Sequence, residues 1–163
     1  MGSYYIAFYK GRKSDNPDTS FFDRLVCLVT LHPYSHVELV YLFSETSKIG
    51  GVWSSSPRDG GVRTTNIQFS PKHWDLYLYE GELPLGAEED TVAYAHSWFR
   101  PKDNMRYDWV GAVASVVRFL KQVETKYFCS EIIAEFFGYK RPSTYTPRKL
   151  FKRMKNKLKK VEL

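Results

Sequence analysis

The stretch SHVELV, residues 35–40, leads into the strongest strand candidate of the chain, which covers residues 37–43. Successive side chains of a strand point to opposite faces of a sheet, so His36 and Glu38 share one face. A carboxylate on that face can accept the N–H of the imidazole and fix its tautomer. A solvated strand edge with two ordinary polar residues has the same pattern, so the pair alone does not decide between these interpretations.

Further strands are predicted on both sides of this stretch, from short aromatic and β-branched runs bounded by turn residues. They lie at residues 4–9, around 52–54, at 62–69 and at 74–79, with turns at 48–51 and 57–61. Gly60 and Gly61 are expected to serve the second turn. The strands from residue 37 onward are predicted to form an antiparallel block.

Helices are predicted from apolar residues that recur with the helical period of 3.6. They cover residues 21–29, 88–99, 108–122 and 129–137, and a last helix begins at the N-cap and N1 pair Thr146-Pro147. Asp108 is predicted to cap the third of these helices, and Gly138 to end the fourth. A strand and a helix, then antiparallel strands, then helices indicate a single α+β domain.

Net charge divides the chain into two parts. The formal charge of the 163 residues is +6, but residues 148–163 hold eight Lys and Arg against one Glu, which leaves residues 1–147 at −1. Basic composition therefore does not make the whole domain a nucleic-acid-binding fold. We expect residues 1–147 to form the domain and residues 148–163 to form a basic amphipathic helix, either part of the same domain or appended to it.

This predicted C-terminal helix has one apolar stripe, made of Leu150, Met154, Leu158 and Val161, and its lysines cover the remaining surface. Such a helix can lie on an acidic membrane surface or contact the phosphates of a nucleic acid. It can also dock on the domain and leave its basic face in solvent. The sequence leaves all three alternatives open.

Simple patterns exclude several classes of protein. No apolar run reaches the ~18 residues of an integral membrane segment, and residues 1–10 lack the basic and apolar regions of a signal peptide. The two cysteines, Cys27 and Cys129, are too few for a disulfide framework, and no cysteine or histidine spacing indicates a metal site. We expect a cytoplasmic protein with free thiols and with neither metal nor cofactor.

Cys129 stands at the start of the predicted helix 129–137, within the run TKYFCSEIIA at residues 125–134. Free N–H groups and the helix dipole favour a thiolate there and can bind an oxyanion. A small buried apolar residue is the alternative interpretation, because Cys is among the most buried residue types. His36 is the candidate base, whereas the other histidines have packing or surface interpretations: His32, His73 and His96.

With these residues, the runs WSSSPRDGGVR (53–63), YDW (107–109) and FCSE (128–131) resemble the circularly permuted branch of the NlpC/P60 papain-like superfamily. That branch includes the YiiX/YaeF-type hydrolases and the lecithin retinol acyltransferase group, in which the His strand precedes the Cys helix, as it does here. The resemblance covers about residues 4–138 and is strongest to small phage and bacterial proteins of unassigned function. It implies a permuted papain-like fold, an antiparallel sheet packed against helices, in the cytoplasm of a bacterium or a phage-infected host.

The resemblance further implies a thiol hydrolase with Cys129 as nucleophile and His36 as general base. In related folds a polar residue of the neighbouring strand orients the histidine. Here that strand offers only serines, Ser54 or Ser55, so Glu38 on the strand of His36 itself is favoured. Glu131 is expected to serve the helix start and to point away from the sulfur.

Residues 54–63 are expected near the mouth of the cleft, where four side chains are candidates for substrate binding: Ser54, Ser55, Arg58 and Arg63. The two arginines would bind an anionic group of a substrate, and a solvated turn is the alternative.

Three functions follow from this interpretation. The first is hydrolysis of an acyl bond in a peptide, acyl or lipid-like substrate, as an amidase, peptidase or thioesterase. The second is acyl transfer to an amine or a lipid, which shares the same acyl-enzyme. The third is a non-catalytic scaffold whose basic C-terminal segment contacts nucleic acid, membrane or a host protein. The intact Cys129 and His36 favour an enzyme over the scaffold.

Overall fold

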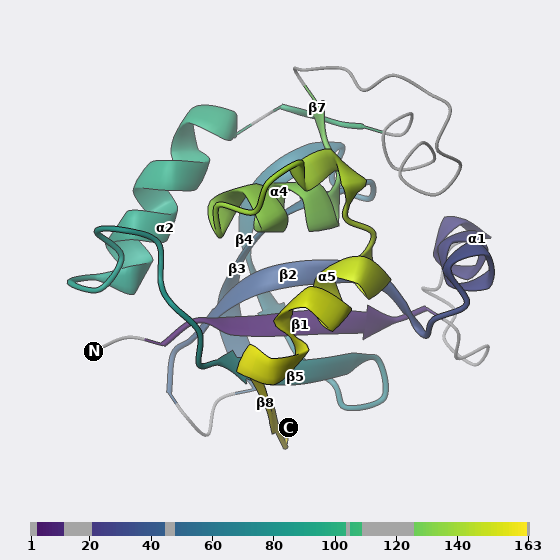
Figure 1. Ribbon diagram of the computed structural model, residues 1–163, viewed down its shortest axis with the longest axis horizontal. Coiled ribbons are helices and arrows are strands. Elements are labelled where there is room, and N and C mark those ends of the chain that lie inside the picture. Colours follow the sequence, from purple (N-terminus) through teal and green to yellow (C-terminus); the bar gives the residue numbers. More distant parts are fainter. Residues whose placement is uncertain (1–2, 12–20, 45–47, 104, 109–125, 163) are drawn as a thin grey trace.

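A computed structural model describes residues 3–11, 21–44, 48–103, 105–108 and 126–162 (Figure 1). Eight strands form one sheet in the order β7-β6-β4-β3-β2-β1-β5-β8. All neighbouring strands are antiparallel except β6 and β7, which run parallel. Their bounds are Tyr5–Lys10 (β1), Tyr34–Leu42 (β2), Ile49–Ser56 (β3), Gly61–Gln68 (β4), Trp74–Tyr79 (β5), Arg106–Tyr107 (β6), Lys126–Tyr127 (β7) and Leu158–Val161 (β8).

The described α-helices are α1 (Phe21–Thr30), α2 (Thr91–Phe99), α4 (Cys129–Phe136) and α5 (Pro147–Met154), with 3-10 turns at Arg100–Lys102, Pro142–Thr144 and Lys155–Lys157. Thr146 caps α5 by accepting from the N–H of Lys149, which confirms the predicted start of the last helix. Helix α2 begins at Thr91 rather than at residue 88 because Asp90 accepts the first free N–H groups. Apart from Asp108, the helix predicted at 108–122 lies outside the described residues. These elements confirm the α+β class and the antiparallel sheet.

The two faces of the sheet carry different residues because side chains alternate along each strand. One face is covered by α2, α4 and α5 (Figure 1) and buries an aromatic and aliphatic core, which includes Phe8, Leu39 and Ile132. The opposite face has a smaller cluster that includes Ala7 and Val40. His36 and Glu38 alternate with the buried Val37 and Leu39 of β2, so both lie on this second face.

The turn between β3 and β4 depends on its two glycines, as predicted. Gly60 has a φ of 81°, which a glycine adopts without steric cost. Gly61 packs directly against β6: a Cβ at this position would lie 1.8 Å from the carbonyl oxygen of Met105. That carbonyl accepts from the N–H of Val62 at 2.9 Å, so the close approach is part of the sheet.

The C-terminal segment differs from the predicted single helix. Helix α5 ends at Met154, and Leu158–Val161 forms the edge strand β8, which pairs with β5 from Tyr79↔Leu158 to Leu76↔Val161. The prediction of one helix over 148–163 is therefore wrong beyond Met154. The unpaired N–H and C=O groups at the edge of β5 offer a strand ladder, and this pairing overrides the helix propensity of a Lys-rich segment.

This strand also settles how the C-terminal segment relates to the rest of the chain. Leu150 and Met154 are fully buried in the main core, and β8 is a member of the sheet, so residues 148–162 are part of the one domain. The spacing of Leu158 and Val161, which looked like a continued helical stripe, belongs to a strand. No helix in the described parts of the chain is both long and apolar enough to cross a membrane.

Candidate active site

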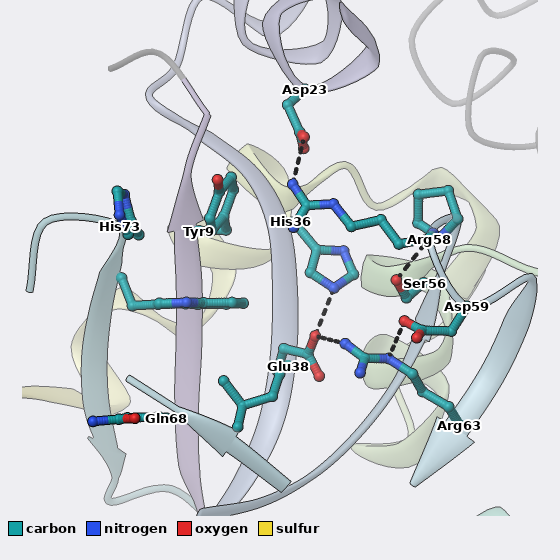
Figure 2. Close-up of a pocket in the computed structure, with 13 residues that line it drawn as sticks. Tyr9, Asp23, His36, Glu38, Ser56, Arg58, Asp59, Arg63, Gln68 and His73 are labelled. Atoms are coloured by element: carbon teal, nitrogen blue, oxygen red, sulfur yellow. Dashed lines mark hydrogen bonds and ion pairs between the residues drawn. The ribbon is translucent and has the colours of Figure 1, made fainter. Parts of the chain in front are cut away.

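His36 and Glu38 contact each other on β2, as their spacing predicts. The Nε2 atom of His36 lies 2.8 Å from Oε1 of Glu38, whose side chain is completely buried (Figure 2). A carboxylate can only accept a hydrogen bond, so Nε2 is the nitrogen that donates. The other ring nitrogen, Nδ1, is therefore left to exchange a proton with a second partner.

Cys129 is the first residue of α4, and Phe128 precedes it in extended conformation. The thiol is 3% exposed and belongs to the core under the helices. Ser130 beside it donates to the carbonyl of Tyr145 at 2.6 Å, and Glu131 accepts from the N–H of Phe128 at 3.4 Å. These bonds fix the first turn of α4, in which the N–H of Glu131 donates to the Phe128 carbonyl and the N–H groups of Cys129 and Ser130 come too early for a carbonyl partner inside the helix.

Cys129 and His36 meet in space although they are far apart in the chain. The last β2–β3 backbone pair is Leu39↔Trp53, so the imidazole lies past the end of that ladder. There it contacts Glu38 on its own face and lies close enough to Cys129 of the helix layer for a negative sulfur to raise its pKa. The three predicted residues thus form one row of contacts: thiol, imidazole and carboxylate.

The charges of Cys129 and Glu38 determine the protonation state of His36. Burial lowers the pKa of His36, but a negative Cys129 raises it, as do the hydrogen bonds to Cys129 and Glu38 and the charge of Glu38. Together they bring the pKa of His36 to about 10. An imidazolium is therefore favoured at neutral pH wherever the sulfur is a thiolate, and each charge stabilises the other.

Glu131 has an electrostatic setting of its own. Burial raises the pKa of this carboxyl, the hydrogen bond from the Phe128 N–H lowers it, and the charges of Asp108 and Glu135 raise it again, to about 8. At pH 7 the carboxyl is mostly uncharged, so it opposes a thiolate on Cys129 very little. The prediction that Glu131 serves the helix start is confirmed by its bond to the Phe128 N–H.

The two arginines lie beside these residues, but each is held by carboxylates. Arg63 on β4 places Nη2 2.8 Å from Glu38 Oε1 and Nε 2.9 Å from Asp59 Oδ2 (Figure 2). Arg58 places Nη2 3.3 Å from Asp23 Oδ2 and lies over the ring of Tyr9. Both therefore belong to ion pairs, but Arg58 also lies half-exposed in the turn between β3 and β4, as the alternative has it, whereas Arg63 is mostly buried on β4.

Ser54 and Ser55, the other two candidates for substrate binding, both bond to the backbone of other strands. Both are fully buried: Ser54 donates to the carbonyl of Val37 at 2.8 Å, and Ser55 donates to the carbonyl of Tyr127 at 2.6 Å. Their hydroxyls join β3 to β2 and β7, and neither side chain lines the cavity beside His36. The assignment of these two serines to substrate binding thus has no support in these contacts, because both hydroxyls are already satisfied by nearby carbonyls, and it stays a prediction.

A cavity of about 380 Å³ opens next to His36 on the second face of the sheet. Its walls combine ion-paired side chains with aromatic rings (Figure 2). Cys129 does not line it, so the imidazole lies between the cavity and the sulfur. The lining residues are Tyr9, Asp23, His36, Glu38, Ser56, Pro57, Arg58, Asp59, Arg63, Ile67, Gln68, His73 and Trp74.

Several residues of this site were missed in the sequence. Tyr9, His73 and Trp74 reach the cavity because β1 pairs with both β2 and β5, and the pair Tyr9↔Trp74 lies beside Tyr9↔His36. Strand alternation would have found Tyr9 and Trp74 once that pairing was known. Tyr107 is buried near Cys129, and burial together with a negative Cys129 raises the pKa of its phenol. Tyr107 belongs to the run YDW that takes part in the family resemblance, but that run assigned it no place beside Cys129.

Comparisons of the chain with protein-family models, with curated proteins and with solved structures found no match.

Proposed function

We propose that the chain is a cysteine hydrolase with a circularly permuted papain-like fold, which cleaves an acyl bond through a Cys129 acyl-enzyme. One observation carries the proposal: His36 lies 2.8 Å from the buried carboxylate of Glu38 and close enough to Cys129 for a negative sulfur to raise the pKa of the ring. The order of the elements supports the permutation, because His36 is on the early strand β2 and Cys129 begins the late helix α4.

The first half of the proposed reaction uses the charged pair. The thiolate of Cys129 attacks the acyl carbon and forms a carbon–sulfur bond, while the N–H groups of the first turn of α4 stabilise the oxyanion. The imidazolium of His36 then gives its Nδ1 proton to the leaving amine, alcohol or thiol as the bond to it breaks. Glu38 accepts from Nε2 throughout, so the ring keeps one orientation.

The second half returns the enzyme to its starting state. Neutral His36 takes a proton from water through Nδ1, and the resulting hydroxide attacks the acyl carbon. The carbon–sulfur bond breaks, the acid leaves, and Cys129 is again a thiolate beside an imidazolium. An amine or a lipid hydroxyl in place of water gives acyl transfer by the same steps, so transfer is the alternative outcome of one mechanism.

The cavity beside His36 is the proposed place for part of the substrate. Three carboxylates and two guanidinium groups line it, and the charge of His36 brings their total close to zero. Aromatic rings of Tyr9 and Trp74 add apolar surface. This lining suits a neutral polar group better than the anionic group expected from Arg58 and Arg63 alone, because both arginines already have carboxylate partners.

The test is to trap the acyl-enzyme. The protein is incubated with p-nitrophenyl acetate and, separately, with an acetyl thioester, and its peptides are weighed by mass spectrometry. We expect one acetyl group on the peptide that contains Cys129, no such group in Cys129→Ala, and slower acylation in His36→Ala. Cys27→Ser is the matched control, since Cys27 is equally buried and donates to the carbonyl of Pro33.

The outcome also separates the alternatives. Equal acylation of both cysteines, or none, contradicts the proposal and favours the non-catalytic scaffold. If Cys129 is acylated, a primary amine added to the reaction distinguishes transfer from hydrolysis by the amide it forms. Contact of residues 148–163 with a polyanion or an acidic membrane surface stays a prediction.

A further inference from the structure

The carboxylate of Glu38 has two partners on the same oxygen. Its Oε1 atom lies 2.8 Å from Nε2 of His36 and 2.8 Å from Nη2 of Arg63 (Figure 2). The second oxygen, Oε2, is buried and has no hydrogen-bond partner in the described part of the chain. The orientation of this carboxylate therefore depends on the contacts of Oε1, and Arg63 supplies one of the two.

The Glu38 carboxylate is buried, so its contacts with His36 and Arg63 must replace its contacts with water. The Glu38 side chain is 0% exposed, and an ionised carboxylate taken out of water must be paired or it becomes neutral. His36 donates a single hydrogen bond to it. Arg63 adds a permanent positive charge in hydrogen-bonding geometry, because a guanidinium is protonated at every pH a protein experiences.

The register of the sheet explains how Arg63 reaches Glu38. Arg63 on β4 is paired with Ser54 on β3, and the β2–β3 register, continued by one residue from Leu39↔Trp53, places Ser54 beside Glu38. These three residues form a row across three strands. Ser54 has a small side chain, and its hydroxyl is turned to the carbonyl of Val37, so the long Arg63 side chain can pass over it.

Asp59 fixes the other side of the same guanidinium. Its Oδ2 atom lies 2.9 Å from Arg63 Nε, at the turn that leads into β4. Arg63 therefore forms ion pairs with two carboxylates, of which the contact of Nη2 with Glu38 is a hydrogen bond and the contact of Nε with Asp59 is an ion pair without hydrogen-bond geometry. Side chains that support a reacting group in this way keep it within the small tolerance that a proton transfer requires.

We propose that Arg63 is a positioning residue for the Cys129–His36 pair, holding Glu38 directed at the imidazole, with Asp59 as its anchor. This inference rests on the proposed function and replaces the substrate-binding role expected for Arg63. Glu38 takes the place of an orienting residue from the neighbouring strand β3, and Arg63 comes from β4, the next strand beyond it.

The experiment measures the rate at which iodoacetamide alkylates Cys129 between pH 5 and 10, in the wild type, Arg63→Gln, Arg63→Lys and Asp59→Asn. At pH 7 we expect Arg63→Gln to slow alkylation by up to about a hundredfold, the effect of a misplaced reacting group. Arg63→Lys keeps the charge and should recover part of the rate, and Asp59→Asn should cause a smaller loss. Arg106→Gln removes an exposed arginine of β6 and should stay within about twofold of the wild type.

A second readout separates positioning from general stabilisation. The ring titration of His36, followed by NMR, should move in Arg63→Gln in the same direction as in Glu38→Gln, whereas a merely structural loss leaves it in place. If Arg63→Gln does not fold, Arg63→Lys and Asp59→Asn give both readouts. A folded Arg63→Gln with wild-type alkylation and titration overturns the positioning role and leaves the nucleophile intact. A wild-type Cys129 no more reactive than Cys27 overturns both this role and the proposed function.

Discussion

Glu38→Gln removes one negative charge 2.8 Å from His36 while it keeps the size of the side chain. A hydrogen bond to a charged group contributes about 1.5–3 kcal/mol, and 1.36 kcal/mol corresponds to one pKa unit. The pKa of His36, which is about 10 with its partners in place, should therefore fall to about 8 or 9 in the variant. The amide still accepts or donates one hydrogen bond, so the fold should be retained.

Glu38→Gln should also lower the stability of the protein, and this effect should depend on pH. The folded-state pKa of His36 lies above its ordinary value of 6.5. Its contribution to stability is thus fully present below about pH 6.5 and is lost as the pH rises to about 10. Through its effect on His36, Glu38→Gln should therefore lower the free energy of unfolding by about 1.5–3 kcal/mol at pH 6. This loss should shrink towards zero above about pH 10.

The assay is an NMR titration of the four histidine rings from pH 5 to 11, with the His36 signal assigned by its loss in His36→Gln, together with urea unfolding at pH 6 and 10.5. Glu80→Gln makes the same chemical change at an exposed position and should leave both measurements unaltered. A wild-type His36 that titrates near pH 6.5, or a midpoint that Glu38→Gln does not move, refutes the reasoning.

Three further changes test the fold around the site by urea unfolding. Gly61→Ala should lower the free energy of unfolding by about 3 kcal/mol, because the added Cβ meets the Met105 carbonyl. A variant as stable as the wild type would contradict the close approach of Gly61 to this carbonyl. Glu131→Gln should stabilise the protein more at pH 8.5 than at pH 5, since a carboxyl with a pKa raised to about 8 destabilises the fold as it ionises; a difference independent of pH would argue against that pKa. A chain ended at Lys157 should be less stable and should self-associate through the exposed edge of β5, and a stable monomer would count against the role of β8.

The fold was predictable where the periodicity of the sequence matches one element only. Residues 74–79 and the helix that starts at Cys129 were found at their observed starts for this reason. The strand β3 proved longer than expected because its last three residues are serines, which are typical of turns. Ser54 and Ser55 are buried in a strand because carbonyls distant in sequence accept from them, and that information is not local.

The prediction of a single helix at the end of the chain was wrong for a related reason. Leu150, Met154, Leu158 and Val161 fit a helical stripe, and nothing near them in the sequence indicates a strand. The partner of β8 is the edge of β5, about 80 residues earlier in the chain, and only the assembled sheet offers that edge. A local pattern therefore predicted the buried residues of this segment correctly up to Met154 and its backbone wrongly beyond it.

The contacts of the candidate site also differ in how far local sequence predicts them. The contact between His36 and Glu38 is a property of one strand and follows from alternation alone. The contact between His36 and Cys129 came from the resemblance to a family, because no local rule joins β2 to α4. The role of Arg63 depends on the register of three strands, and a register shift of one residue would turn its side chain to the other face.

The buried ion pair of Glu38 and Arg63 needs an explanation other than the stability of the fold. The second face of the sheet is otherwise lined by apolar side chains such as Val40 and Leu76, which would stabilise the fold without any ion pair. A buried ion pair rarely stabilises a protein more than apolar residues of the same volume do. Glu38 and Arg63 are therefore poorly explained by stability, and they lie beside His36, whose pKa a negative Cys129 raises. Charges held at a cost beside a strongly perturbed titratable group are typical of catalytic sites. The arrangement thus favours chemistry at Cys129 over a purely structural use of this face.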